Sequence, residues 1–139
     1  CLRPGIDGVS ENIRVRSVVG RLLEHSRILV AQNNGDTQVY LMSADWMPRN
    51  FIRRVEIAFP IENKQVKERI IQNILQVYLN DNDSARVLDA AGQYTRLKHE
   101  GKDAINAQRL FIDECRSSPE QQQAAQAKSK HLRKIRPAK

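Results

Sequence analysis

Residues 26–44 read SRILVAQNNGDTQVYLMSA and carry the clearest structural pattern of this 139-residue chain. The polar run Asn-Asn-Gly-Asp at 33–36 is a strong turn signal, because asparagine and glycine tolerate the positive φ angles of tight hairpin turns. The segments on either side, 26–32 and 37–44, have the apolar and β-branched residues of strands. The pattern therefore predicts a β-hairpin.

Two helices are expected after the hairpin. Residues 64–79 place apolar side chains along one stripe at helical spacing, and Asn63 precedes them as a candidate N-cap. A second helix is expected over 103–115, with Asp103 as its cap.

The other expected elements are short. They are a loop over 1–12, a strand passing into a short helix over 11–24, a loop over 45–50, and strands at 53–59, 86–88 and 93–97. Strands and helices of this number predict an α/β (mixed α+β) fold, with a mixed β-sheet flanked by helices.

The composition is that of one ordinary globular domain, with 40% hydrophobic and 28% charged residues. No apolar run approaches the roughly 20 residues of a membrane-spanning helix. The chain opens at Cys1 without a basic-then-apolar leader, so we expect no signal peptide and a piece cut from a longer protein. With only Cys1 and Cys115 as cysteines, a disulfide scaffold and a zinc site are disfavoured, and a cytoplasmic setting is expected.

The positive charge is concentrated near the C-terminus. Of a net +7, residues 117–139 carry +5, from six basic side chains and one acidic one. We therefore expect a domain over 1–116 and a basic tail over 117–139, which either solubilises the chain or touches a polyanion or an anionic membrane surface. The first 60 residues contain eight arginines and no lysine, a bias that fits bidentate phosphate recognition as well as it fits chance.

His25 and Arg27 are the first candidates for chemistry. Side chains two apart on a strand share a face, so the strand expected over 26–32 would bring both toward one site. An imidazole beside a guanidinium suits phosphoryl transfer, because the cation neutralises phosphate oxygens while histidine moves a proton or is itself phosphorylated. A carboxylate near His25 would fix its tautomer, and Glu56 and Asp45 are the candidates. The alternatives are a structural histidine and a solvated Glu56 paired with a neighbouring arginine.

Three longer motifs resemble the C-terminal part of bacterial polyphosphate kinase, a family that makes polyphosphate chains from ATP. They are LRPGIDGVSENIRVRSVVGRLLEHSRI at 2–28, SADWMPRN at 43–50 and RRVEIAFPI at 53–61, and the resemblance covers about residues 1–97. The C-terminal halves of that family are similar to the phospholipase D superfamily, which implies a phospholipase D-like half-domain. The superfamily has His-x-Lys followed by an aspartate where this chain has Arg27 and Gln32, and these departures argue against a phosphodiesterase.

The resemblance implies a reversible kinase and assigns roles to four residues. The γ-phosphoryl group of ATP would pass to a histidine upstream of Cys1 and then to the end of a polyphosphate chain. His25 would contact ATP and assist the transfer, Glu56 would be a catalytic carboxylate near it, and Arg27 and Arg54 would bind phosphate. Magnesium is expected with its ligands upstream, so no metal ligand is assigned within this chain.

The implied partners are ATP and ADP, inorganic polyphosphate and the remaining domains of the same kinase. For the full-length protein we expect a homo-oligomer, no specific nucleic acid and peripheral membrane association. The piece alone is expected to be inactive. Two other functions stay open: a phospholipase D-like phosphodiesterase or nuclease, and a non-enzymatic polyanion-binding module that depends on residues 117–139.

Overall fold

The computed structural model describes residues 2–99, 101 and 103–116, so the predicted tail over 117–139 lies outside the described residues. The chain divides into two compact units. The hairpin unit is Leu23–Gln76, and the terminal unit joins Cys1–Leu22 to Val77–Lys139. No helix in the described part of the chain is long and apolar enough to cross a membrane.

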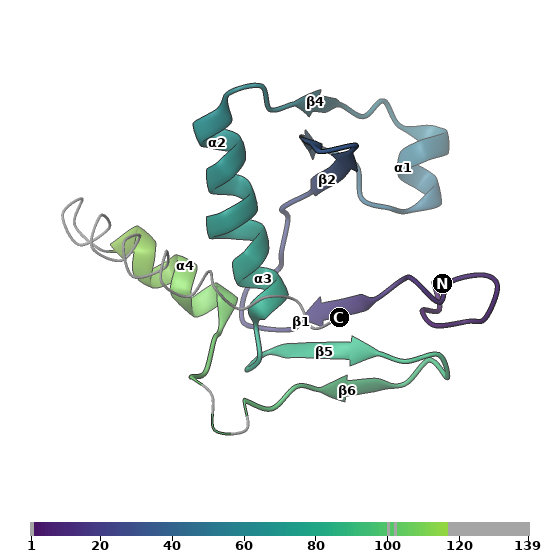
Figure 1. Ribbon diagram of the computed structural model, residues 1–139, viewed down its shortest axis with the longest axis vertical. Coiled ribbons are helices and arrows are strands. Elements are labelled where there is room, and N and C mark those ends of the chain that lie inside the picture. The colour runs from purple at the N-terminus through teal and green to yellow at the C-terminus, as the bar shows by residue number, and fades with distance from the viewer. Residues whose placement is uncertain (1, 100, 102, 117–139) are drawn as a thin grey trace. The chain divides into compact units, whose positions relative to one another are not determined.

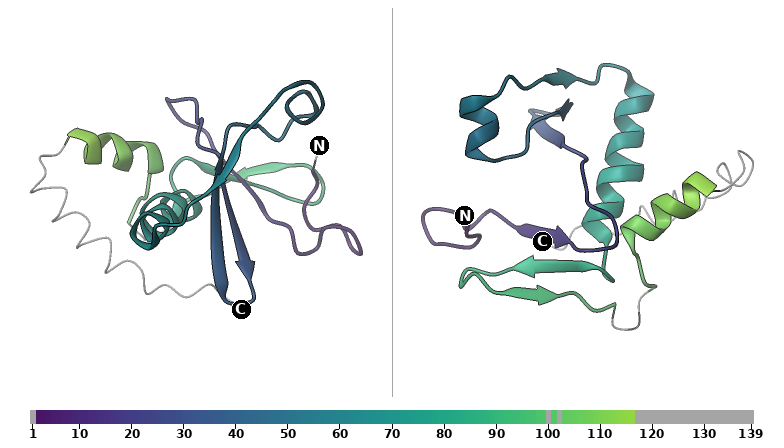
Figure 2. Two further views of the ribbon diagram at one scale, coloured as in Figure 1. Left: turned by 90° about the horizontal axis from the view of Figure 1, so that it is seen from above. Right: turned by 180° about the vertical axis from the view of Figure 1, so that it is seen from behind.

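A three-stranded antiparallel sheet forms the centre of the hairpin unit. Its strands are β2 (Ile28–Asn33), β3 (Asp36–Met42) and β4 (Ala58–Pro60), in the spatial order β2-β3-β4. The left view of Figure 2 shows β2 and β3 as a long dark-blue hairpin, in which Val30 pairs with the buried Val39. Asn34 and Gly35 have φ angles of 47° and 94° at the turn, the positive values that tight hairpin turns favour. The predicted hairpin is confirmed.

A short helix, α1 (Pro48–Arg53), lies in the connection from β3 to β4 (Figure 1). It replaces the loop and the beginning of the strand that were predicted here. Pro48 stands in the first turn, where its missing N–H costs nothing because first-turn donors have no partner within the helix. The strand predicted over 53–59 is wrong except at its end, because β4 covers only Ala58–Pro60. Val55 is 99% exposed, so the apolar alternation before β4 does not mark a buried strand face.

The long helix predicted over 64–79 is confirmed. It consists of α2 (Lys64–Arg69), a π-helical segment η1 (Ile70–Leu75) and α3 (Gln76–Asn80). Asn63 caps it as expected, since its Oδ1 accepts the N–H groups of Gln65 and Val66 at 3.0 and 3.1 Å. Within the hairpin unit, Lys67 Nζ donates to the carbonyl of Thr37 at 3.0 Å. This bond holds α2 beside the start of β3.

A second three-stranded antiparallel sheet lies in the terminal unit. Its strands are β1 (Val15–Val18), β5 (Ala85–Leu88) and β6 (Tyr94–Arg96), in the spatial order β1-β5-β6. Figure 1 and the right view of Figure 2 show the three strands side by side, and Val15 pairs with Leu88. The strands predicted near residues 15, 86–88 and 93–97 are confirmed. The short helix predicted to follow the first of them is wrong, because residues 19–27 are irregular.

The last helix, α4 (Ala107–Arg116), begins later than predicted. Asn106, not Asp103, caps it, since Asn106 Oδ1 accepts a helical N–H at 3.0 Å. The residues before α4 are held outside the helix by Asn82, whose Oδ1 accepts the N–H of Ile105 at 2.7 Å. Asn82 therefore anchors the chain just before α4 begins.

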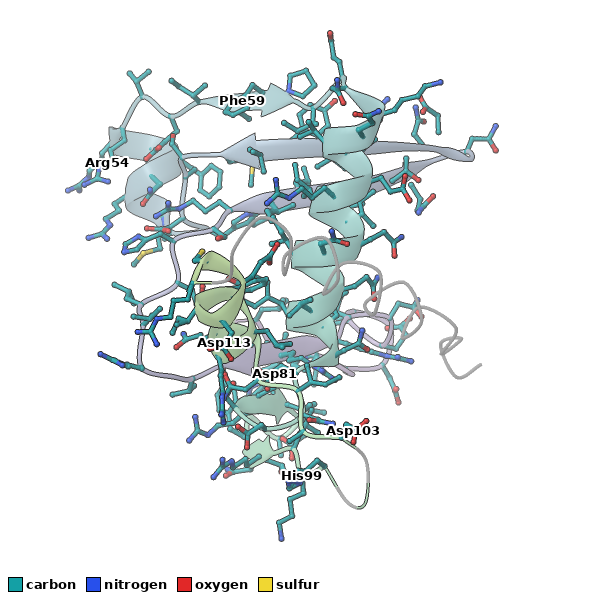
Figure 3. The ribbon with its side chains drawn as sticks, turned by 90° about the vertical axis from the view of Figure 1, so that its left-hand side faces the viewer. Arg54, Phe59, Asp81, His99, Asp103 and Asp113 are labelled. Atoms are coloured by element: carbon teal, nitrogen blue, oxygen red, sulfur yellow. The ribbon has the colours of Figure 1, made fainter. Side chains whose placement is uncertain are left out.

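Asp81 organises the terminal unit from a fully buried position, with 0% of its surface exposed (Figure 3). Its Oδ1 accepts the N–H groups of Asp83, Ser84 and Ala85 at 3.1, 2.7 and 2.9 Å. Its Oδ2 accepts the Ser84 hydroxyl at 2.6 Å and the N–H of Ala107 at 2.8 Å. Burial acts to raise the pKa of this carboxyl, but the donors from Ala107, Ser84 and Ala85 prevail and lower the pKa below its ordinary value. One carboxylate thus joins the start of β5 to the start of α4.

The predicted class, a mixed α/β fold, is confirmed. The strands nevertheless form two separate antiparallel sheets and not the single mixed sheet that was expected. The reason is the pairing of β1 with β5, two strands that lie on opposite sides of the hairpin unit in the sequence. Among the described residues, the strands of the hairpin unit then pair with one another and with no strand of the terminal unit.

Candidate functional site

His25 and Arg27 lie in the extended segment that leads into β2. Because β2 starts at Ile28, the strand predicted over 26–32 begins two residues later than expected, and neither residue belongs to it. The main chain is still fixed here, since the carbonyl of Arg27 accepts the N–H of Met42 at 3.0 Å. His25 is exposed to solvent. Both residues therefore stand at the open end of the β2–β3 hairpin, away from its turn.

The guanidinium of Arg27 joins the two ends of this hairpin. Its Nε donates to Oδ1 of Asp45 at 2.7 Å, and its Nη2 lies 2.7 Å from the same oxygen. Its Nη1 donates to the backbone carbonyl of His25 at 2.9 Å. We call this arrangement of His25, Arg27 and Asp45 the guanidinium bridge.

The electrostatics of the bridge favour its charged form. The hydrogen bond from Arg27 lowers the pKa of the Asp45 carboxyl against the opposing effect of burial, and the charges of Arg27, Arg49 and His25 add to this. The same hydrogen bond raises the pKa of Arg27, with a further contribution from the charge of Glu56. Of the two carboxylates predicted near His25, Asp45 is therefore the one that belongs to the guanidinium bridge.

An open pocket of about 270 Å³ lies at this end of the hairpin. Its lining comes from the entry to β2, the end of β3 and the following loop: Ser26, Arg27, Ile28, Met42, Ala44, Asp45 and Trp46. Trp46 is 76% exposed and meets Phe51 of α1 edge to face, with the ring centroids 5.9 Å apart. The pocket thus combines a cation, a carboxylate and an aromatic wall within the hairpin unit.

Glu56 is held in a separate hydrogen-bond network. Its Oε1 accepts from Nδ2 of Asn50 at 2.8 Å, and its Oε2 accepts from the Ser43 hydroxyl at 2.5 Å. The Ser43 hydroxyl oxygen in turn accepts the N–H of Ile57 at 3.0 Å. Asn50 is 2% exposed, and its Oδ1 has no hydrogen-bond partner among the described residues. Glu56 therefore links the end of β3 to α1 and to the approach to β4.

Arg54 lies just after α1 and is exposed. Figure 3 shows its side chain at the outer edge of the hairpin unit, directed away from the strands. The structure therefore brings His25, Arg27 and Asp45 together and places the charge of Glu56 within reach of Arg27. Of the four residues that the resemblance assigned to the site, Arg27 lines the pocket, and His25, Glu56 and Arg54 lie outside its lining. The sequence did not reveal that Asp45 binds Arg27, although a carboxylate after the returning strand of a hairpin was a usable signal.

The carboxylates of this region are not arranged for a metal ion. Across residues 2–99, 101 and 103–116, no group of three or more His, Cys, Asp or Glu side chains could hold one. Asp45 binds Arg27, and both oxygens of Glu56 already accept hydrogen bonds. The described residues therefore do not fit a magnesium site, and the expectation that magnesium binds upstream stays a prediction.

Comparison with known proteins gives one consistent result. Residues 1–108 match the family described as polyphosphate kinase C-terminal domain 2. The chain is 54% identical over 111 residues to a polyphosphate kinase of Paraburkholderia phytofirmans, covering 80% of this chain and 16% of the relative. It is 55% identical over 101 residues to one of Pseudomonas aeruginosa, covering 73% of this chain and 14% of the relative.

A solved structure agrees with this result. The crystal structure of polyphosphate kinase from Porphyromonas gingivalis matches with a TM-score of 0.75 and 31% sequence identity, over 94% of this chain and 18% of that chain. The chain thus spans only about a sixth of the length of the relatives it matches. It belongs to the polyphosphate kinase family, as a part of the family's C-terminal domain 2.

Proposed function

We propose that this chain is part of an enzyme that reversibly transfers the γ-phosphate of ATP to polyphosphate. The supporting observation is the position of His25, which is exposed and bound through its carbonyl to Arg27, the cation of the pocket. The names of the relatives give the reaction class. The prediction that the piece is inactive alone belongs to this proposal.

The transfer would take place in two steps. An imidazole nitrogen of a histidine upstream of this chain attacks the γ-phosphorus, a P–N bond forms, and ADP leaves with the electron pair of the broken P–O bond. A terminal oxygen of polyphosphate then attacks that phosphorus, and the histidine is released. Charge spreads over the phosphoryl oxygens in each transition state, so positioning and neutralisation by the protein supply most of the acceleration.

The residues of this chain would serve the transfer in different ways. His25 would bind ATP and assist as a proton donor or acceptor at the phosphate oxygens. Arg27 has two N–H groups beyond those that bind Asp45 and His25, and these could contact phosphate at the pocket. Glu56 would act as the catalytic carboxylate near them, and the exposed Arg54 would bind phosphate from the solvent side.

Several wider expectations belong to the same proposal. The full-length enzyme would use magnesium bound outside this chain, form a homo-oligomer, act in the cytoplasm and associate peripherally with membranes. ATP, ADP, inorganic polyphosphate and the other domains of the kinase would be its partners.

The test is a pair of histidine substitutions in the full-length kinase that contains this chain. His25→Ala should lower ATP-dependent polyphosphate synthesis by at least about 100-fold, the smaller contribution expected of an acid–base group. His99→Ala is the matched control, because His99 is exposed in the loop after β6 (Figure 3) and should leave synthesis unchanged. Near wild-type synthesis by the His25 variant would contradict the proposal.

The two other functions give different results in the same assays. A phosphodiesterase would cleave a phosphodiester substrate without nucleotide. A polyanion-binding module would lose polyphosphate binding on deletion of residues 117–139 and keep it in the His25 variant.

A further inference from the structure

We infer that Asp45 is a positioning residue, which acts through Arg27 to hold the backbone of His25 at the pocket. This inference rests on the proposed function, since it concerns the group that would assist phosphoryl transfer. Asp45 does not need to touch the imidazole or the substrate to have this effect.

The guanidinium bridge has the connectivity that such a role requires. Asp45 follows β3 and His25 precedes β2, so both lie beyond the regular pairing of the hairpin, whose first paired residues are Ile28 and Leu41. Outside that pairing, the main chain is held by the bond from the N–H of Met42 to the carbonyl of Arg27. Arg27 adds a side-chain connection, with Asp45 on one edge of the guanidinium and the His25 carbonyl on another, at 2.7 and 2.9 Å.

The shape of the guanidinium explains why arginine is needed. A planar fork can donate from Nε and Nη2 to one carboxylate oxygen while Nη1 donates elsewhere, and a lysine ammonium does not provide this fixed geometry. The Arg27 and Asp45 side chains are 24% and 40% exposed, so solvent competes with the bridge only in part. Loss of Asp45 would leave Arg27 free to rotate and the segment carrying His25 without its side-chain support.

The charges around the bridge give this role a kinetic signature. Asp45 forms an ion pair with Arg27 and partly neutralises the pocket, and the charge of Arg49 also acts on it. Its removal should therefore make the pocket more attractive to a polyanion and, at the same time, leave His25 poorly placed. A positioning role predicts that kcat falls while the KM for ATP stays constant or decreases. A loss of binding would raise KM instead.

The experiment measures kcat and KM for ATP in the full-length kinase. Asp45→Ala should lower kcat at least about 10-fold, within the range that misplacement of a reacting group causes, without raising KM. Asp45→Asn should recover part of the lost kcat, because its amide oxygen can still accept from Arg27. Asp36→Ala, which removes a carboxylate at the turn end of the same hairpin, should match the wild type.

Arg27→Lys provides a second route if Asp45→Ala yields no folded enzyme. Lysine preserves the charge opposite Asp45 but cannot bridge to the His25 carbonyl in the same geometry, so kcat should again fall. Because Arg27 is itself a proposed phosphate ligand, this variant is judged by its kcat and not by its KM. A wild-type kcat in a folded Asp45→Ala enzyme would overturn the inference, and so would a raised KM for ATP at unchanged kcat in that variant. If Asp45→Ala does not fold, a wild-type kcat in Arg27→Lys would overturn it.

The outcome for His25→Ala separates this inference from the proposed function. Full synthesis by that variant would reject the proposed function, whatever the Asp45 variants do. A dead His25→Ala enzyme beside wild-type Asp45 variants would reject only the positioning role.

Discussion

Asp81→Ala should destabilise the terminal unit more than any exposed substitution in it. The change deletes Oδ1, which accepts the N–H groups of Asp83, Ser84 and Ala85, and Oδ2, which accepts the N–H of Ala107. The start of β5 and the start of α4 would lose their common partner. The expected effect is therefore on folding of the unit and not on a local loop alone.

The magnitude follows from the donors that would be left without a partner. Ala85 and Ala107 are both 0% exposed, so water cannot easily replace the carboxylate at their N–H groups. Each buried donor left unsatisfied costs about 1–3 kcal/mol, which gives about 2–6 kcal/mol for the two. The donors of Asp83 and Ser84 are in partly exposed residues and can turn to water at a smaller cost.

The assay is urea unfolding of this chain followed by circular dichroism, together with hydrogen exchange at the amides of Ala85 and Ala107. Asp103→Ala is the control, because Asp103 is exposed in the same unit (Figure 3) and surface changes usually stay within about 0.5 kcal/mol. Equal unfolding midpoints and equal exchange rates for the two variants would refute the reasoning.

The same carboxyl predicts a dependence on pH. The pKa of Asp81 is lowered by folding, so its contribution is fully present above the unfolded value of about 3.9. The contribution is lost as the pH falls through the lower, folded pKa. The stability difference between the wild type and Asp81→Ala should therefore be constant near neutral pH and shrink below about pH 4.

Two further substitutions test local contacts in the two units. Asn63→Ala removes the cap that accepts two N–H groups of α2 and should lower the free energy of unfolding by about 1 kcal/mol. Glu62→Ala, a change at the neighbouring exposed residue, should leave it unchanged. Equal urea midpoints for the two variants would contradict the capping role. Gly20→Ala places a Cβ 2.5 Å from Oε1 of Gln108, so the side-chain amide of Gln108 must move. That amide binds the backbone N–H and carbonyl of Leu22 at 2.8 and 2.7 Å, and the move breaks both bonds. The free energy of unfolding should fall by about 1–3 kcal/mol for those two bonds. The same Gly20→Ala change should cost much less in a Gln108→Ala background. Additive costs in this double-mutant cycle would show that the clash does not matter.

The parts of the fold that depend on local signals were predictable from the sequence. Asn34 and Gly35 fixed the hairpin, and Asn63 with the apolar stripe fixed the long helix. The prediction of a loop over 45–50 failed because proline is common both in loops and in the first turn of a helix. Pro48 indicated a loop although proline is equally suited to the first turn of a helix. The separation into two sheets was not predictable, because the pairing of β1 with β5 joins segments far apart in the sequence.

The contacts of the candidate site could not be predicted from the sequence, and the roles assigned to its residues stay predictions. The motifs pointed to His25, Arg27 and Glu56, and spacing suggested that the first two act together. The expected shared strand face is not what joins them, because β2 begins only at Ile28. Their connection is a side-chain bond from Arg27 to a carbonyl, with Asp45 as the third member, and such a contact depends on how two loops meet in space.

Trp46 gives this chain an optical property that follows from its place beside Arg27. It is the one tryptophan among the 139 residues, it lines the pocket, and it stands edge-on to Phe51. The near-ultraviolet emission of the chain therefore originates almost entirely at the open end of the hairpin. Quenching by an added oligophosphate, or a spectral shift on losing the carboxylate next to Arg27, would report events at that pocket without any attached dye. In a longer protein the same readout needs every other indole to be replaced first.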